Sequence, residues 1–199
     1  MIELPRASDI TAYHDAALGG RRQARAGAPW QAIADNHRLN CLLWDEEDLA
    51  RRRNVSDAEI AANKRAIDGY NQQRNDAIER VDEALVSALA DAPRLSGARL
   101  SSETAGAMID RLSILSLRIH HMRLQTERDD VERAHVELCR ARLERLVEQR
   151  ADLAGCLDRL LAECRDGSSV FKVYRQFKMY NDPALNPAIY GESRRPSRS

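Results

Sequence analysis

The sequence predicts an all-α protein: an up-and-down bundle of four long helices with a short N-terminal helix and a C-terminal helix plus extended tail. Two observations predict this class. Charged residues make up 31% of the chain and aromatic residues only 5%, and a chain so rich in Ala, Leu, Arg and Glu is typical of long helices. Helix start and stop signals recur along the chain, whereas the alternating patterns that favour strands are nearly absent.

The first predicted elements are a short helix, a linker and a long helix. Ser8 is a suitable cap for a helix that ends at the Gly-Gly pair 19–20, and residues 19–28 form a flexible basic linker. Pro29 fits the first turn of the next helix, where its missing N–H removes no hydrogen bond. The helical pattern then continues to about Arg53.

Capping residues mark the next two long helices. Ser56 and Glu59 make the S-x-x-E capping box, which starts a helix that stops before Pro93. Ser101 or Ser102 caps the following helix, which runs to about residue 125.

The longest predicted helix opens at Thr126, which makes an S/T-x-x-D start signal with Asp129. It runs to about Arg165 and ends at Asp166-Gly167, because glycine readily adopts the left-handed conformation that closes a helix. The amphipathic segment 170–180 is expected to form the C-terminal helix.

Prolines keep residues 181–187 extended, and the polar residues 191–199 are expected to be disordered. The chain therefore divides into an N-terminal helix and linker (1–28), a helical bundle domain (29–190) and a tail (191–199). A coiled coil is the competing architecture. The apolar positions do not keep a strict heptad, so we favour the globular bundle.

Bulk composition excludes several classes of function. Lys plus Arg equal Asp plus Glu at 31 each, so the formal net charge is zero, and we expect no nucleic-acid partner. No apolar run approaches the roughly 20 residues of a membrane span. The N-terminus lacks a signal-peptide pattern, so we expect a cytoplasmic protein. The four cysteines are widely spaced, which argues against a disulfide framework or a zinc knuckle.

A polar stripe follows the helix predicted from Pro29 to Arg53. Because successive helical residues are rotated by about 100°, six of its residues share an arc of about 100°: His37, Asn40, Trp44, Glu47, Asp48 and Arg51. Its leucines occupy a different face, so the helix is expected to pack on two sides. The stripe therefore predicts a half-buried polar face.

The helix that begins after Ser56 carries a second polar stripe, about 80° wide, made of Lys64, Asp68, Asn71, Asn75, Glu79 and Asp82. Apolar residues lie beside it, and Arg74 falls within the apolar sector. An ordinary charged helix flank is the alternative interpretation. Asparagine is a poor helix former, however, so Asn71 and Asn75 favour a role for their amide hydrogen bonds.

The third long helix is apolar nearly all round, which predicts a central position. Glu103, Gly106, Asp110 and Ser113 share one side. Gly106 costs about 1 kcal/mol relative to alanine, which indicates close approach by another backbone or by a ligand. A buried carboxylate is expensive unless it is paired, so Asp110 needs a cationic partner, and the candidates are Arg111, Arg74 and Lys64.

A fourth polar group lies where the predicted C-terminal helix meets a proline-fixed turn. It consists of Lys178, Tyr180, Asn181 and Asp182. The alternative is that aromatic residues hold this segment on the bundle while Asn181 or Asp182 forms an Asx turn.

Four sequence blocks carry a family resemblance. They are H-x-x-N-x-x-L-W-x-x-E-D-x-x-R (37–51), K-R-x-I-D-x-x-N-Q-x-R-N-D-x-I-E-x-x-D (64–82), S-E-T-x-G-x-M-I-D-R-L-S-I-L (102–115) and K-M-Y-N-D-P-x-x-N-P (178–187). Together they resemble a bacterial family of about 200 residues that is known only as a domain of unknown function. The resemblance spans about residues 37–187. It implies a link to cell-envelope sugar transfer and supplies no catalytic assignment.

A second resemblance rests on fewer residues. Glu79-x-x-Asp82, which follows the acidic helix that holds Glu47 and Asp48, is similar to the Mg²⁺-binding motifs of all-α nucleotide pyrophosphohydrolases. Those enzymes bind the metal with E-x-x-E on one helix and E-x-x-D on the next. Here the nearest spacing on the first helix is Asp45 with Asp48, which departs from that pattern.

The converging stripes favour a small-molecule site inside the bundle. Mg²⁺ prefers oxygen ligands, so it is the cofactor that the stripes suggest, with Glu47, Asp48, Glu79 and Asp82 as its candidate ligands; Asp68, Glu103 and Asp110 are further carboxylates near them. The cations available to neutralise phosphate groups are Arg51, Lys64, Arg74 and Lys178.

His37 is the only histidine on a polar stripe, which makes it the best candidate for a general acid or base. Glu47, Glu79 and Asp82 are the other catalytic candidates. The alternative for His37 is a hydrogen-bonded structural histidine. His120 and His121 are adjacent rather than four apart, so we interpret them as packing or surface residues.

A non-catalytic interaction protein is the rival hypothesis, and the sequence leaves open whether the chain is an enzyme. In that case the stripes are buried networks that fix helix register, and the chain binds a protein partner or forms a homodimer.

Overall fold

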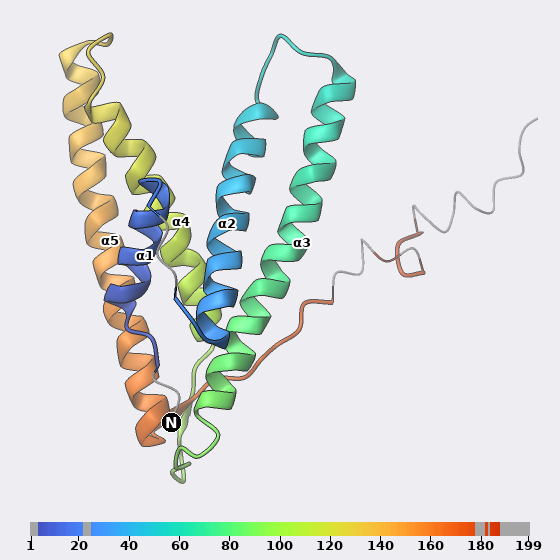
Figure 1. Ribbon diagram of the computed structural model, residues 1–199, viewed down its shortest axis with the longest axis vertical. Coiled ribbons are helices and arrows are strands. Elements are labelled where there is room, and N and C mark those ends of the chain that lie inside the picture. Colours follow the sequence, from blue (N-terminus) through green and yellow to red (C-terminus); the bar gives the residue numbers. More distant parts are fainter. Residues whose placement is uncertain (1–3, 22–24, 178–181, 183, 188–199) are drawn as a thin grey trace, which may run out of the picture.

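Two antiparallel helical hairpins form the body of the protein (Figure 1). The computed structural model describes residues 4–21, 25–177, 182 and 184–187. Its elements are α1 (Ala7–Leu18), α2 (Ala28–Leu49), α3 (Asp57–Ala88), β1 (Arg99–Leu100), α4 (Ala105–Thr126), α5 (Arg133–Asp166) and β2 (Ser169–Val170). The prediction of an all-α protein is confirmed.

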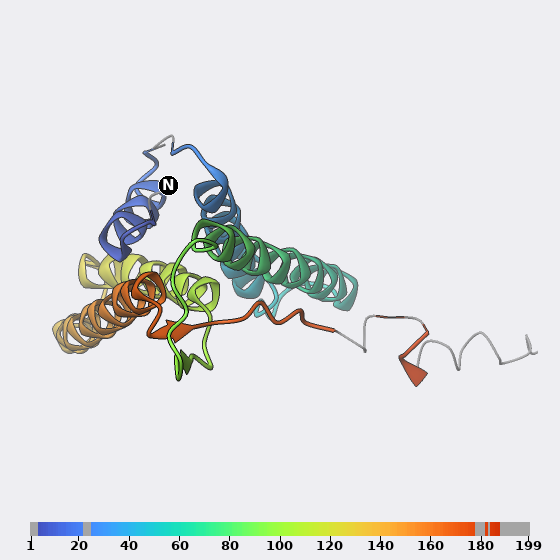
Figure 2. The same ribbon diagram turned by 90° about the horizontal axis from the view of Figure 1, so that it is seen from below.

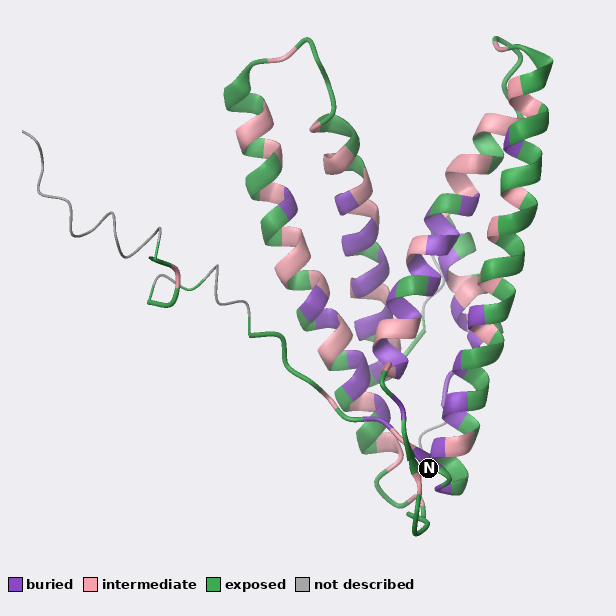
Figure 3. Cartoon of the chain, turned by 180° about the vertical axis from the view of Figure 1, so that it is seen from behind, coloured by how far each residue is buried: buried purple, intermediate pink, exposed green. Residues whose placement is uncertain are grey.

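The hairpins α2–α3 and α4–α5 meet near the C-terminal end of α3 and diverge toward their far ends (Figure 1). Successive long helices alternate in direction, which gives the predicted up-and-down order. The short helix α1 packs against α4 and α5. Seen from below, the two hairpins make an open angle (Figure 2). Buried residues gather where the hairpins meet, and exposed residues dominate their free ends (Figure 3).

Some predicted helix boundaries hold and others shift. The cap of α1 is Arg6 rather than Ser8, and α2 ends at Leu49 rather than near Arg53. The Ser56 capping box with Glu59 is present, and Gly167, with φ 84°, closes α5. The cap of α4 is Thr104 rather than Ser101 or Ser102, because its hydroxyl accepts the amide N–H of Ala107 at 3.1 Å.

The expected start of the longest helix at Thr126 is wrong, because α4 continues to Thr126 and α5 begins only at Arg133. The Thr126 hydroxyl donates back to the carbonyl of Arg123 at 2.7 Å and so belongs to the end of α4. An ion pair between Arg128 and Asp130 lies within the turn that follows.

The expected C-terminal helix is also wrong over residues 170–177; residues 178–180 lie outside the described part of the chain. Ser169–Val170 instead pair in parallel with Arg99–Leu100, and residues 171–177 form neither helix nor strand. Phe171 is buried in the core, and Arg175 reaches Glu83 on α3 at 2.7 Å. These tertiary contacts override the amphipathic pattern.

Gly106 brings two backbones together where the hairpins meet. A Cβ atom at this position would lie 2.6 Å from the carbonyl oxygen of Ile78 and 2.8 Å from Oδ1 of Asp82. The sequence indicated close approach by a backbone or by a ligand, and the neighbour is the backbone of α3. Apolar side chains complete the core around this contact, among them Leu85, Ile109 and Leu157.

Among the described residues, no helix is both long enough and apolar enough to cross a membrane.

We predict that Gly106→Ala lowers the free energy of unfolding by about 2 kcal/mol or more, because the added methyl group would push α4 away from α3. Urea denaturation followed by circular dichroism measures this change. The matched control is Gly155→Ala in α5, where nothing lies within 4 Å of the added atom. This substitution should raise the free energy of unfolding by up to about 1 kcal/mol. Equal effects of the two substitutions would contradict the close approach.

Candidate functional site

Several sequence-predicted residues come together in one buried group, here called the polar junction, where α1, α2, α3 and α4 meet. All but Arg74 are buried, and Arg74 is half-buried. The members of the polar junction are His14, Asn36, His37, Asn40, Arg74, Asp110 and Ser113. His37, Asn40, Arg74 and Asp110 were predicted as site residues.

The carboxylate of Asp110 is the centre of the polar junction. Its Oδ1 accepts hydrogen bonds from the side-chain amides of Asn36 at 2.8 Å and Asn40 at 2.9 Å. The guanidinium Nε of Arg74 lies 3.9 Å from the same oxygen. Two amide donors and a nearby cation offset the cost of burying this charge. Of the three cations predicted as partners of Asp110, Arg74 is therefore the one that the structure brings close.

Two stacked histidines extend the polar junction toward α1. The rings of His14 and His37 are 4.4 Å apart and inclined by 22°. His37 Nδ1 and the Ser113 hydroxyl are hydrogen-bonded at 2.8 Å, whereas both ring nitrogens of His14 are buried without a hydrogen-bond partner among the described residues. Burial lowers the pKa of His37 to about 4 and lowers the pKa of His14 as well, so both rings are neutral at pH 7.

Asp82, a predicted catalytic and metal-binding residue, contacts the start of α4. Its Oδ1 accepts the amide N–H of Gly106 at 2.6 Å. A carboxylate at this position stabilises the positive end of the helix dipole. Burial and the neighbouring Glu79 raise the pKa of Asp82 to about 6, although hydrogen bonds from Thr104 and Gly106 oppose the shift. This geometry gives Asp82 a structural contact between α3 and α4.

Glu79, which was also predicted as catalytic and metal-binding, holds the segment that follows β2. Its Oε1 accepts the amide N–H of Gln176 at 3.0 Å, and its Oε2 lies 3.7 Å from the guanidinium of Arg175. Glu79 therefore fixes this segment on α3 (Figure 2).

The structure does not gather the four predicted metal ligands. Arg80 pairs with Asp35 near one end of the α2–α3 hairpin, and Asn63 donates to Glu46 near the other. At 1.5 Å per residue, Glu79 and Glu47 are therefore separated by roughly 18 Å along the hairpin. Within the described residues, no group of three or more His, Cys, Asp or Glu side chains is arranged to hold a metal ion.

The remaining predicted residues are spread along the helices. Glu47 pairs with Arg51 and Lys64 with Asp68 on exposed helix surface. Glu103 pairs with Arg111 at 2.6 Å, Asn75 is buried and Asn71 is half-buried.

The predicted C-terminal polar group falls mostly outside the described residues, which include only Asp182 among its members. Its Oδ1 accepts the amide N–H of Ala184 at 2.8 Å, which is the Asx turn given as the alternative. Lys178, Tyr180 and Asn181 lie outside the described part of the chain.

A cavity of about 420 Å³ lies between α2, α4 and α5 and contains two of the predicted residues, Trp44 and Asp48. The Trp44 and His121 rings stack at 4.3 Å with an interplanar angle of 7°. The indole N–H of Trp44 is buried and has no hydrogen-bond partner in the described part of the chain. We call this cavity the Trp44 pocket; its lining residues are Trp44, Asp48, Arg118, His121, Met122, Gln125 and Leu146.

Sequence reasoning missed Arg118, His121 and Gln125 as members of this pocket. His121 was assigned to packing or surface because it is adjacent to His120, and that spacing gives no metal site. The available signal was the i, i+3 and i+7 spacing of Arg118, His121 and Gln125, which places them on one face of α4.

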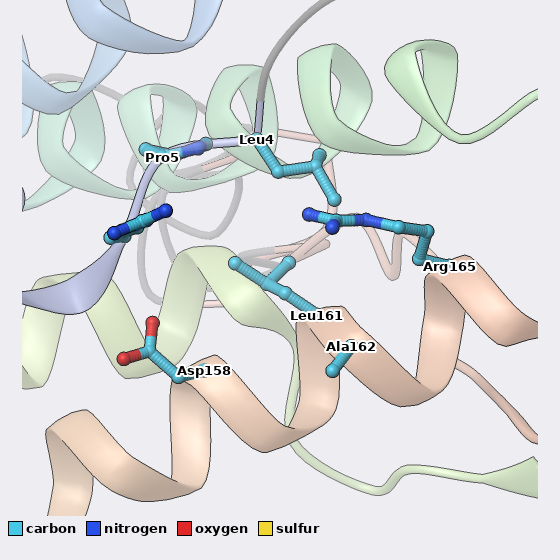
Figure 4. A pocket seen from close by; sticks show the side chains of 7 residues that line it. Leu4, Pro5, Asp158, Leu161, Ala162 and Arg165 are labelled. Atoms are coloured by element: carbon cyan, nitrogen blue, oxygen red, sulfur yellow. The ribbon is translucent and has the colours of Figure 1, made fainter.

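Two further cavities of about 320 Å³ lie near the ends of the helices. One lies between α5 and the residues that precede α1. Its walls are the side chains of Asp158, Leu161 and Arg165 on one side and of Leu4 and Pro5 on the other (Figure 4). In that cavity Asp158 accepts the amide N–H of Ala7 at 2.8 Å, which ties the start of α1 to α5. The other lies between the end of α3 and β2 and includes Arg94 and Phe171.

The chain belongs to a protein family described as a protein of unknown function, DUF4254, whose family model matches residues 30–173. The match includes the polar junction apart from His14, and it includes the whole Trp44 pocket. No curated protein and no solved structure matches the chain.

We predict that the free energy of unfolding falls as the pH drops from 7 to 4.5. A histidine whose pKa is lowered by folding binds a proton more readily when unfolded, so His14 and His37 lose their contributions below about pH 6.5. The raised pKa of Asp82 acts in the opposite direction. Between pH 7 and pH 4.5 the His37 and Asp82 effects are each about 2 kcal/mol and opposite in sign. They nearly cancel, so the lowered pKa values of His14 and His121 set the sign.

Urea denaturation at the two pH values tests this expectation. His14→Phe should reduce the difference in the free energy of unfolding between pH 7 and pH 4.5. Asp82→Asn should enlarge that difference by removing the opposing contribution. His120→Gln, outside the polar junction, is the matched control. A protein that becomes more stable at pH 4.5, with no change in the His14 variant, would contradict the assignment.

Proposed function

We propose that this protein binds a small molecule that carries a flat ring and a negatively charged group, and that the Trp44 pocket is its site. The observation that carries the proposal is the combination of a Trp–His stack, a cation (Arg118) that has no partner among the described residues, and a cavity of about 420 Å³. Cavities of this size with a few convergent polar groups are typical of small-ligand sites.

The aromatic side of the pocket supports recognition of a ring. Ligand rings favour offset or edge contacts with aromatic side chains, and Trp44 and His121 offer such surfaces. Burial lowers the pKa of His121, which keeps its ring neutral at pH 7. The buried indole N–H of Trp44 has no acceptor within the described residues, and a ligand acceptor would remove the cost of leaving it unpaired.

The charged side of the pocket supports recognition of an anion. Arg118 has no ion-pair or hydrogen-bond partner within the described residues, so its guanidinium is available to a phosphate or a carboxylate. The Asp48 carboxylate and the Gln125 amide can accept hydrogen bonds from ligand hydroxyl groups. Nucleoside phosphates and nucleotide sugars combine these features. Nucleotide sugars also agree with the link to sugar transfer that the family resemblance implies.

A non-catalytic interaction protein is the second candidate, and the polar junction favours it. The junction's side chains bond mainly to one another, and Asn36, His37 and Asn40 are each at most 3% exposed. Such a network fixes helix register and requires no ligand. A Mg²⁺-dependent pyrophosphohydrolase receives less support, because its carboxylates are separated along the α2–α3 hairpin. A homodimer stays a prediction.

We predict that nucleotide sugars or nucleoside diphosphates quench the fluorescence of Trp44. The experiment uses a Trp30→Phe background, which leaves Trp44 as the only tryptophan. Arg118→Gln should weaken binding of the quenching ligand at least tenfold, because it removes the charge-assisted contact. Arg94→Gln is the matched control, since Arg94 lines a different cavity and also lacks a partner among the described residues.

The same titration distinguishes the two candidates. Saturable quenching that is lost in Arg118→Gln and kept in Arg94→Gln supports the small-molecule site. A well-folded protein whose fluorescence is unaffected by millimolar nucleotide sugars or nucleoside diphosphates would overturn the small-molecule site in favour of the interaction protein. Quenching that persists in Arg118→Gln would show that the anion does not bind as proposed.

A further inference from the structure

The polar groups of the Trp44 pocket lie on two sides of its aromatic rings. The helices α2 and α4 run side by side in the same direction (Figure 1). Asp48 and Gln125 each lie four residues beyond a stacked ring on their own helix, which is about 6 Å at a rise of 1.5 Å per residue. Arg118 lies three residues before His121, on the opposite side of the rings. The pocket therefore presents, in order, a cation, an aromatic surface and a pair of polar side chains.

Asp48 and Gln125 offer a defined set of hydrogen-bonding atoms. An ionised carboxylate has only acceptor atoms, and that of Asp48 has no ion-pair or hydrogen-bond partner among the described residues. Oε1 of Gln125 already accepts a hydrogen bond from Arg128 at 3.1 Å, whereas its two N–H donors are unpaired within the described part of the chain. A ligand at this level therefore meets acceptors from Asp48 and donors from Gln125.

A nucleotide whose phosphate lies at Arg118 would turn the far edge of its base toward Asp48 and Gln125. The ribose hydroxyl groups lie between the base and the phosphate, so they do not reach this level. Adjacent N–H donors on the base edge suit a carboxylate, whereas an acceptor placed opposite a carboxylate oxygen is repelled. Among the common bases, only guanine has two adjacent donors there, N1–H and the 2-amino group, beside an acceptor, O6.

We propose that the Trp44 pocket selects guanine nucleotides: the Asp48 carboxylate accepts N1–H and the 2-amino group, Gln125 donates to O6, and Arg118 binds the phosphate. This inference rests on the proposed function of the pocket and names the base of its ligand. Adenine, cytosine and uracil would each place an acceptor of their own, N1, N3 or a carbonyl oxygen, against the carboxylate. Guanosine diphosphate and guanosine diphosphate sugars share the selected base.

The experiment measures the affinities of four nucleoside diphosphates by quenching of Trp44 fluorescence in the Trp30→Phe background. We expect guanosine diphosphate to bind at least about tenfold more tightly than adenosine diphosphate, because adenine loses two hydrogen bonds and gains a repulsion. Inosine diphosphate lacks only the 2-amino group and should lie between them. Xanthosine diphosphate has a carbonyl group in place of the 2-amino group and should bind no more tightly than adenosine diphosphate.

The Asp48→Asn variant exchanges one acceptor of the side chain for a donor. It should weaken guanosine diphosphate by about tenfold and strengthen xanthosine diphosphate by a similar factor, because the amide donates to the xanthine 2-carbonyl and still accepts N1–H. Asp48 is exposed, so the variant should keep its fold. The matched control is Asp45→Asn, which removes another exposed carboxylate of α2 that acts electrostatically on His121 but does not line the pocket.

The outcomes separate this inference from the proposed function. Equal affinities for the four nucleotides, all lost in Arg118→Gln, would overturn the selection of guanine and leave the Trp44 pocket standing. A preference for guanine that persists in Asp48→Asn, or that Asp45→Asn also removes, would overturn the role of Asp48. Failure of every nucleoside diphosphate and nucleotide sugar to quench Trp44 would overturn both proposals.

Discussion

The arrangement of the helices depends on the carboxylate of Asp110. It lies on α4 and accepts hydrogen bonds from two asparagines of α2, with Arg74 of α3 beside it. A shift of one helix by a turn would take these partners away from the carboxylate. Such a shift is unfavourable, because a buried charge is costly without partners. The two hairpins meet near the C-terminal end of α3 and diverge from there (Figure 1), and the polar junction fixes the register of the helices at this crossing.

The register set by Asp110 also assembles the Trp44 pocket. Asn40 contacts both Asp110 and Ser113, so α2 and α4 run side by side in the same direction from that level. Trp44 lies one turn beyond Asn40, and His121 lies two turns beyond Ser113. Their stacking follows from this shared direction. A pocket whose walls come from two hairpins therefore depends on hydrogen bonds that lie outside it.

Sequence periodicity predicted the angular position of side chains well and their height along the bundle poorly. It identified Asn40 and Asp110 as inward-facing, named Arg74 among the partners, and indicated close packing at Gly106. It also placed Glu47 and Glu79 in one site, although they lie at different levels of the α2–α3 hairpin. The pocket formed by Trp44, Arg118 and His121 depends on how α2 and α4 cross, which no single helix encodes. Similarly, Phe171 is buried in the core by contacts with residues distant in the sequence, and the local pattern of apolar residues around it does not predict these contacts.

One helix, α4, serves both the polar junction and the proposed ligand site. Asp110 and Ser113 face the polar junction, while Arg118, His121 and Gln125 line the Trp44 pocket on another side. Since a helix with intact hydrogen bonds moves as a rigid unit, the contacts that hold one side of α4 also fix the positions of the groups on the other. The residues of the Trp44 pocket are therefore held in place by a network that lies outside the pocket. Loosening the Asp110 contacts would weaken binding through misplacement of Arg118 rather than through loss of any ligand contact.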